Sequence, residues 1–377
     1  MDLSLSETQE MFKRTARDFL AAEFPTSLVR RIESDRRGYS PEVWQKMAEL
    51  GWLSVPFPEQ WGGLDGSLVD VAVLAEEMAQ AAALSPYIST LLSGLLILRA
   101  GNDAQKERFL PKIAAGGLII STALIEPSGS YEAEGIRLSA VARGDRYILN
   151  GTKLFVEYAS AAQELICVAR TRSGGPDATT GISLFIVPAD APGVTIGNLT
   201  TIGGDRQSEV VFDDVEVPKD RLVGQLHGAW PSVEWLLDVA RALAAVELVG
   251  FGQKALDMTV DYIGYREAFG RPIGSFQVAQ HHCANMAIWL EGPRCAAYEA
   301  TWRLSKGLDA RFHAAVAKAS ASNAGREVTM LAHQLHGGIG YMAEFDLHFY
   351  SRRAKGWELK WGTPDQLLRK VADYAGI

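Results

Sequence analysis

The spacing of hydrophobic residues divides the 377-residue chain into two helical stretches, separated by one stretch with strand-like alternation. In residues 1–115, apolar residues recur three and four positions apart, which is the period of one face of an α-helix. Ser6 has the chemistry of an N-cap for the first helix, and further helices are predicted over residues 69–82 and 103–114. The pattern therefore predicts an N-terminal α-helical domain.

Strand-like segments fill residues 116–230. Apolar and β-branched residues form alternating or short continuous runs in LIISTALI, ELICVARTR, GISLFIVP and SEVVFDDVEVP. Residues that favour turns punctuate this region: Gly144-Asp145, Asn150-Gly151, Gly174-Gly175 and Pro188. Short strands separated by turns predict a middle antiparallel β-domain.

The helical period returns in residues 231–377, with long runs over residues 234–265, 276–306 and 310–335. A chain of this length exceeds the usual size of a single hydrophobic core, so two or three subdomains are expected. The order helical, then β, then helical predicts a protein of the α+β class.

Composition and charge narrow the classes of function. The chain is 47% hydrophobic and 22% charged, which is ordinary for a globular protein with large buried cores. Its net charge of -8 argues against a nucleic-acid partner, because phosphate binding needs a positive field. The apolar stretch around Leu91–Leu98 is too short to span a bilayer, and Met1–Phe24 lacks the apolar core of a signal peptide. We expect no membrane association and a cytoplasmic location.

Cysteine and histidine spacing gives no sign of a metal site. Cys167, Cys283 and Cys295 have no CxxC spacing, and such a sparse, odd set fits reduced thiols in the cytosol. His333 and His336 lie close together but have no carboxylate or Cys at ligand spacing. No metal is expected.

Two segments near the C-terminus are candidates for ligand binding. The first, His336–Tyr341 (HGGIGY), follows a helical pattern, whereas a dinucleotide-binding turn needs a preceding strand. Its glycines fit either a structural turn or a helix C-terminus whose exposed amides approach a ligand. The second, Arg266–Gln277 (REAFGRPIGSFQ), lies between two helices. Its arginines fit either a solvated face or the partners of a pyrophosphate.

With these two motifs, the chain resembles the acyl-CoA dehydrogenase family. PEQWGGLDG, ERFLPKIAAGG, ALIEPSGS, GDRYILNGTK and VFDDVEVP resemble that family in the same order, so the resemblance covers essentially the whole chain. It implies an N-terminal α-helical domain over residues 1–115, a middle antiparallel β-domain over 116–230 and a C-terminal four-helix bundle over 231–377. It also implies FAD bound where two subunits meet.

The resemblance assigns a cofactor role to six residues. In the family, the matching positions hold the adenine and pyrophosphate of a neighbouring subunit's FAD, and all are present here: Arg266, Phe269, Ile273, Gln277, Gln334 and Gly338. A guanidinium suits phosphates, an aromatic ring packs on a base, and amides donate hydrogen bonds. The resemblance also implies that Asp238 and Arg241 contact the acyl-CoA substrate.

The position of the catalytic base departs from the family pattern. The family's reaction removes a proton from Cα of an acyl-CoA thioester, and a hydride passes from Cβ to flavin N5. Most members use a Glu directly before a Gly-Thr pair, where this chain has Trp361. A minority use a Glu immediately before the Arg that corresponds to Arg241, where this chain has Ala240. Neither side chain can accept a proton.

The side of the site that faces the flavin departs as well. Ile125 stands where the family usually has a Thr whose hydroxyl faces the flavin. Tyr131 stands where a small Ser is usual, and Glu157 where a Thr donates to N5. An ionised carboxylate cannot donate, and it opposes charge accumulation on the reduced flavin.

The residues predicted to contact adenine and pyrophosphate are present, whereas the usual catalytic base and flavin-facing residues are replaced. This combination leads to our main hypothesis. The chain is predicted to be the non-catalytic subunit of an α2β2 heterotetramer. Its partner would be a homologous subunit that carries the catalytic Glu. The family includes such heteromeric enzymes for bulky substrates, such as steroid side-chain CoA thioesters, and the segment EFDLHFYSRRAKGWELKWG resembles chains from those systems.

Two alternatives remain open. The chain could be a complete homo-oligomeric enzyme with a displaced base. Glu247 is the best candidate for that base, because it lies seven residues from Ala240 and therefore on the same helical face. Asp238 and Glu157 are weaker candidates, and Glu247 also fits a buried residue paired within the bundle. The second alternative is a flavin-free assembly or binding protein on the same scaffold.

Overall fold

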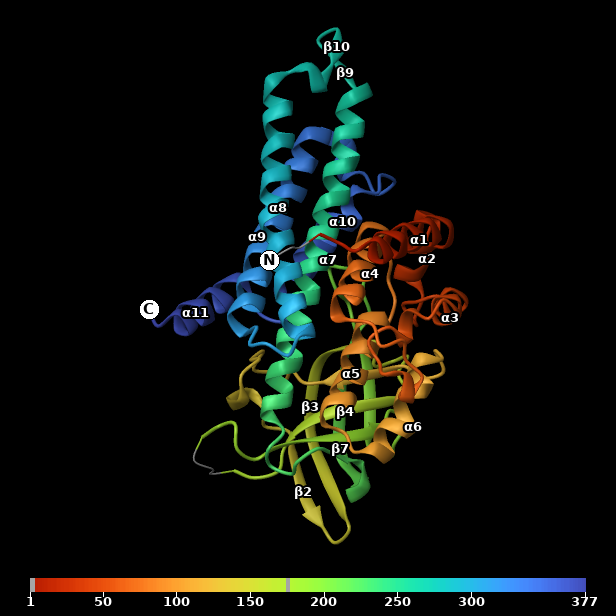
Figure 1. The fold of residues 1–377 in the computed structure, drawn as a ribbon, viewed down its shortest axis with the longest axis vertical. Coiled ribbons are helices and arrows are strands. Elements are labelled where there is room, and N and C mark those ends of the chain that lie inside the picture. Colours follow the sequence, from red (N-terminus) through yellow and green to blue (C-terminus); the bar gives the residue numbers. More distant parts are fainter. Residues whose placement is uncertain (1–3, 174–176) are drawn as a thin grey trace.

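The computed structural model describes residues 4–173 and 177–377 and has the predicted α+β architecture. Figure 1 shows a β-domain at one end of an elongated molecule, short helices from the N-terminal part beside it, and long helices that extend away from it. The N-terminal part contains α1 (Glu7–Glu23), α2 (Thr26–Ser34), α3 (Pro41–Glu49), α4 (Leu68–Gln80), α5 (Tyr87–Ala100) and α6 (Asp103–Ala114).

Capping residues account for where several of these helices begin. Ser6, Ser67 and Asn102 each form a capping box, in which the cap and the third helical residue satisfy each other's backbone amide groups. The helices predicted over residues 69–82 and 103–114 are therefore confirmed. The structure adds α5, which is buried along much of its length and so lacks the polar face that makes a helix recognisable.

The middle part forms one eight-stranded sheet, with strand order β6-β7-β3-β2-β4-β5-β8 and β1 paired with β4. Its strands are β1 (Ile120–Ala123), β2 (Ser139–Arg143), β3 (Arg146–Glu157), β4 (Glu164–Arg170), β5 (Ile182–Pro188), β6 (Val194–Leu199), β7 (Gln207–Pro218) and β8 (Leu222–Val223). Most pairs are antiparallel as predicted, but β1 pairs with β4 in parallel, and β2 meets β4 in parallel at one position.

The turn predictions in the sheet had mixed outcomes. Gly144-Asp145 connects β2 to β3, as predicted. The prediction of a turn at Asn150-Gly151 was wrong, because both residues lie inside β3 at a shift in its register with β7. Gly151 has φ 144°, and a Cβ there would lie 3.0 Å from Leu138, so the glycine permits this bulge. The predicted turn at Gly174-Gly175 lies outside the described residues.

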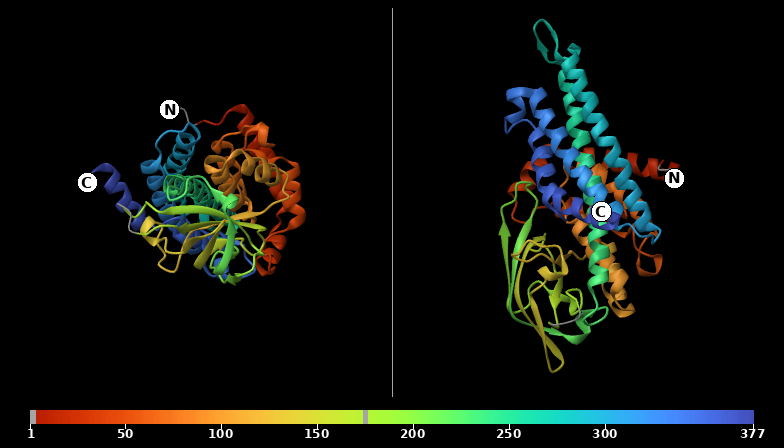
Figure 2. Two further views of the ribbon diagram at one scale, coloured as in Figure 1. Left: turned by 90° about the horizontal axis from the view of Figure 1, so that it is seen from below. Right: turned by 90° about the vertical axis from the view of Figure 1, so that its left-hand side faces the viewer.

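The C-terminal part is built from α7 (Trp230–Tyr265), α8 (Gln277–Ser305), α9 (Arg311–His336), α10 (Leu347–Leu359) and α11 (Pro364–Ala375). Helices α7 to α10 pack on one another, and α11 packs on α9. Helix α7 also contacts α4 and α5, so it joins the bundle to the N-terminal helices. A small hairpin of β9 (Glu267–Ala268) and β10 (Arg271–Pro272) lies at the far tip of the bundle (Figures 1 and 2).

A buried arginine ties the three parts together close to the candidate site. Arg353 of α10 has a side chain that is 1% exposed and lies 3.1 Å from the carboxylate of Glu33 in α2. Its guanidinium also donates to the backbone carbonyls of Gly203, before β7, and of Ala82, after α4. One side chain therefore fixes α10 against both the β-domain and the N-terminal helices.

Candidate functional site

Four positions that the sequence analysis singled out line one small cavity. Ile125 follows β1, Tyr131 lies in the loop between β1 and β2, Glu157 ends β3, and Trp361 follows α10. The cavity measures about 30 Å³, which is room for one or two water molecules. Residues up to 236 positions apart in the chain thus meet between the sheet and the C-terminal segment.

Tyr131 and Trp361 are in direct contact. The backbone N–H of Trp361 donates to the Tyr131 hydroxyl at 2.9 Å, and the ring centroids lie 6.0 Å apart. Burial raises the pKa of Tyr131 to about 12, so its hydroxyl stays protonated at neutral pH. Trp361 has φ 61°, a left-handed conformation that is strained for an aromatic residue. The backbone at Trp361 therefore keeps a strained conformation, although the side chain there is not the Glu that the family pattern predicts.

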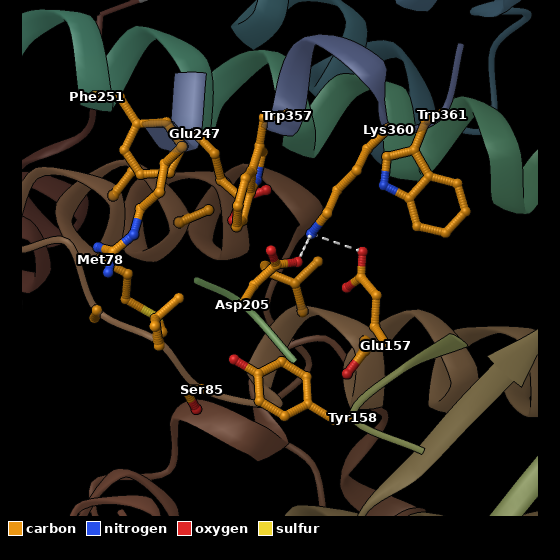
Figure 3. A pocket seen from close by; sticks show the side chains of 17 residues that line it. Met78, Ser85, Glu157, Tyr158, Asp205, Glu247, Phe251, Trp357, Lys360 and Trp361 are labelled. Atoms are coloured by element: carbon orange, nitrogen blue, oxygen red, sulfur yellow. Dashed lines mark ion pairs between the residues drawn. The ribbon is translucent and has the colours of Figure 1, made fainter. Parts of the chain in front are cut away.

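Glu157 is paired with a lysine next to Trp361 (Figure 3). The Lys360 Nζ lies 3.0 Å from Glu157 Oε1 and 2.8 Å from Asp205 Oδ2. It also lies 3.7 Å from the centroid of the Trp357 ring, within the range of a cation–π contact. The sequence pattern predicted a role for Glu157 but gave no sign of Lys360 and Asp205, although Lys360 directly precedes Trp361.

Lys360 and Asp205 remain ionised despite their burial. Burial alone would lower the pKa of Lys360, but Asp205 and Glu157 raise it above its usual value. Burial would likewise raise the pKa of Asp205, but Lys360 and hydrogen bonds from Gln207 and Thr201 lower it. Lys360 is therefore an ammonium and Asp205 a carboxylate at neutral pH, and Glu157 lies on the other side of the Lys360 Nζ.

Glu247 lines the adjoining cavity, which also measures about 30 Å³ and is bordered by Trp361. Burial raises the pKa of Glu247 to about 7, although Lys360 and a hydrogen bond from Trp357 act in the opposite direction. In Figure 3, Trp357 and Lys360 lie between Glu247 and Trp361. Glu247 therefore has a pKa that suits a general base, but an indole and an ammonium separate it from the predicted position of the chemistry.

Ala240, Arg241 and Asp238 lie together on α7, and all three are buried. The Arg241 guanidinium donates to the backbone carbonyl of Trp361 at 3.1 Å and to the carboxylate of Asp238 at 3.0 Å. Burial raises the pKa of Asp238 to about 6, while Arg241 acts to lower it. Here Arg241 holds the Trp361 turn in place, and its contact with substrate stays a prediction.

The residues predicted to hold adenine and pyrophosphate lie at the other end of the bundle, around the tip hairpin: Arg266, Phe269, Ile273, Gln277, Gln334 and Gly338. All are exposed except Ile273, which packs partly buried against α7 and α8. Phe269 is 96% exposed. A Cβ added at Gly337 or Gly338 would meet no atom within 4 Å, so their backbone is open to a ligand. The tip hairpin lies far from the β-domain (Figure 1), whose strand β3 contributes Glu157 to the cavity at Trp361.

Three family sequence models match successive parts of the chain. The acyl-CoA dehydrogenase N-terminal domain matches residues 6–117, the middle domain residues 121–215, and the C-terminal domain residues 228–375. The chain belongs to the acyl-CoA dehydrogenase family. Probable acyl-CoA dehydrogenase YngJ of Bacillus subtilis (strain 168) is 32% identical over 372 residues, which is 97% of each chain.

Two solved structures are similar to this chain over nearly their full length. The first is a variant of the Tcur3481-Tcur3483 steroid ACAD, 30% identical with a TM-score of 0.88 over 99% of both chains. The second is the ChsE4-ChsE5 complex from Mycobacterium tuberculosis. It is 25% identical, with a TM-score of 0.91 over 100% of this chain and 99% of that chain.

Acyl-CoA dehydrogenases are flavoproteins, but the residues here fit only half of an FAD. The exposed guanidinium, aromatic ring and open glycine amides at the bundle tip fit an adenine and a pyrophosphate. Around Glu157 the cavities measure about 30 and 20 Å³, far too small for a flavin ring. Ile125 offers no hydrogen-bond donor there, and Glu157 is engaged with Lys360. The residues at the position where the resemblance places this chain's flavin therefore do not fit the group.

The described part of the chain contains neither a membrane-crossing helix nor a cluster of metal ligands. No helix within residues 4–173 and 177–377 is long and apolar enough to cross a bilayer. The same residues include no group of three or more His, Cys, Asp or Glu side chains arranged to hold a metal ion. Cys167, Cys283 and Cys295 are all free thiols, and Cys167 is fully buried.

Proposed function

We propose that this chain is the non-catalytic subunit of a heteromeric FAD-dependent acyl-CoA dehydrogenase. One observation carries the proposal: Trp361, which stands where the resemblance places the family's proton acceptor, is bonded to Tyr131 and flanked by the ion-paired Lys360. None of these groups can take a proton from Cα of a thioester. The cavities beside them are too small for a flavin and an acyl chain.

The partner is a homologous subunit that carries the catalytic Glu, in an α2β2 heterotetramer in the cytoplasm. The exposed set around Phe269 supports this, because an aromatic ring that is 96% exposed gains much by packing against another chain. The similarity to the ChsE4-ChsE5 complex, which pairs two different proteins, supports it as well.

In this arrangement the chain's residues bind and orient, while the partner's site performs the reaction. The Arg266 guanidinium pairs with the pyrophosphate of the partner's FAD, Phe269 packs against its adenine side, and the amides at Gly338 approach the phosphates. Ile273, Gln277 and Gln334 complete this contact. FAD supplies the acceptor for the substrate hydride when it is bound.

The substrate class is an acyl-CoA with a bulky acyl group, such as a steroid side chain. The similarity to a steroid ACAD at 30% identity supports this class. The acyl group lies in the partner's pocket, since this chain offers a cavity of only about 30 Å³ beside Trp361.

Co-expression tests the proposal. The chain expressed alone should lack the flavin absorbance band near 450 nm and should show no acyl-CoA dehydrogenase activity. Co-expressed with a homologue that bears the Glu, it should co-purify as a yellow, active complex. An isolated chain that is yellow and active would contradict the proposal, and a colourless complex would point to a flavin-free assembly protein.

One observation favours a second candidate function, a complete enzyme whose base is Glu247. Its raised pKa, about 7, is that of a general base, and it borders the same cavity as Trp361. On this hypothesis the isolated chain is active, and Glu247→Gln abolishes its activity. Activity that survives this substitution excludes Glu247 as the base.

A further inference from the structure

Lys360 links segments that are far apart in the chain. It is the C-cap of α10, whereas Glu157 ends β3 and Asp205 lies in the loop before β7. Both ion pairs of Lys360 therefore cross from the C-terminal segment to the β-domain, at the cavity where the family pattern places flavin and thioester (Figure 3).

The cluster is buried and well satisfied. The side chains of Lys360, Glu157 and Asp205 are 12%, 16% and 4% exposed. Asp205 also accepts hydrogen bonds from Gln207 Nε2 at 2.8 Å and from Thr201 Oγ1 at 2.9 Å, so both of its oxygens are used. Close geometry with additional hydrogen bonds is the condition under which a buried ion pair offsets its desolvation.

Removing Lys360 alone should cost more stability than removing Lys360 and neutralising Asp205 together. Loss of the ammonium leaves Glu157 and Asp205 without the Lys360 Nζ that pairs with both, and Glu247 borders the same cavity. An uncompensated buried charge strongly destabilises the folded state. Neutralising Asp205 together with Lys360 removes much of that penalty.

We propose that Lys360 is a built-in plug, which holds the β-domain against the C-terminal segment in place of a bound ligand and keeps this chain's pocket closed. The proposal rests on the proposed function in one respect, namely that a catalytic subunit would fill this position with flavin and thioester. In a subunit without its own flavin, other groups must occupy the space between the sheet and the bundle. The ion-paired Lys360 side chain occupies it, together with Trp357 and Trp361.

The test compares Lys360→Met with Lys355→Met in the full chain within its complex. Lys355 lies on the same helix and pairs with Glu358 at 3.2 Å, but its side chain is 48% exposed. Lys360→Met should lower the melting temperature by about 5 °C or more, and Lys355→Met by no more than about 1 °C. Equal melting temperatures for the two variants would overturn the proposal.

Hydrogen–deuterium exchange separates a plug from a general loss of stability. In Lys360→Met, exchange should rise about tenfold or more in segments 155–158, 201–206 and 359–362, and stay unchanged in α8 and α9. A uniform rise, or none, would overturn the proposal.

A double variant keeps the test usable if Lys360→Met does not fold. Lys360→Met with Asp205→Asn should melt closer to the unchanged chain than Lys360→Met does, and a double variant that is no more stable would overturn the proposal. These readouts do not depend on the number of bound flavins. A complex with one FAD per chain would defeat both the proposed function and the closed pocket. Equal melting temperatures for Lys360→Met and Lys355→Met in a complex with one FAD per two chains would overturn the role of Lys360 alone.

Discussion

The backbone N–H of Trp361 donates to the Tyr131 hydroxyl at 2.9 Å, so two residues predicted to depart from the family pattern bond directly to each other. A third departure, Glu157, is paired with Lys360, the neighbour of Trp361. The unusual residues therefore form one complementary group and are not isolated losses. The contact explains why restoring a single family residue should not restore a catalytic site.

Trp361→Glu should not create acyl-CoA dehydrogenase activity in the isolated chain. A carboxylate at this position would still face Tyr131, and Glu157 with Lys360 would still occupy the flavin position. Acyl-CoA-dependent reduction of an electron-accepting dye measures the outcome, with Trp361→Phe as the control. Turnover by Trp361→Glu above that of Trp361→Phe would show that the rest of the site is intact.

Arg266→Ala in this chain should weaken FAD binding by the whole complex. A charge-assisted hydrogen bond contributes about 1.5–3 kcal/mol, so the Kd for FAD should rise by about tenfold or more. Titration of the flavin-depleted complex with FAD measures this change. Arg143→Ala, at an exposed position on β2, is the control and should leave the Kd unchanged. Equal affinity of the two variants would exclude the predicted role of Arg266.

Glu247 should make the chain less stable as the pH rises from about 4.5 to about 7. Its pKa is raised from 4.5 to about 7 in the folded state, so across this window the native state binds more protons than the unfolded state. Stability then falls with rising pH and levels off above the folded-state pKa. The loss amounts to about 3–4 kcal/mol.

Urea unfolding at several pH values measures this effect. Glu247→Gln should flatten the decline, whereas Glu107→Gln, at an exposed position on α6, should keep it. Burial also raises the pKa of Asp238, which adds a decline of the same sign in every variant. The difference between the two Gln variants therefore isolates Glu247, and parallel curves would contradict the assignment.

Arg353→Met should destabilise the chain by about 3–5 kcal/mol, because it removes a buried cation and leaves two backbone carbonyls without their donor. Arg352→Met is the matched control. Arg352 contacts the same Glu33 carboxylate at 2.8 Å, but its side chain is 31% exposed, so a loss of about 1 kcal/mol or less is expected. Denaturant unfolding compares the two. A similar loss in both variants would rule out the special role of Arg353.

Most of the fold prediction came from the spacing of hydrophobic residues along the chain. It separated the helical parts from the β-part, because a polar face on each helix and turn residues between strands leave a readable pattern. It missed α5, whose surroundings are apolar on nearly all sides. The parallel pairing of β1 with β4 was also missed, since a strand's sequence does not name its neighbour.

The prediction of the site came from the positions of residues within the motifs that resemble the family. It selected Ile125, Tyr131, Glu157 and Trp361, and the structure brings these four together around one cavity. It could not find Lys360, because a lysine in a charged segment has the same local signature as a solvated one. Its partner Asp205 lies 155 residues away, and only the folded chain shows the pair.

The ratio of FAD to protein chains tests the central claim most directly. Native mass spectrometry of the complex purified with the homologous partner counts chains and flavins in one particle. The account predicts two copies of this chain, two partner chains and two FAD molecules. An active particle with one FAD for every chain, or an active homotetramer of this chain with four FAD molecules, would contradict it.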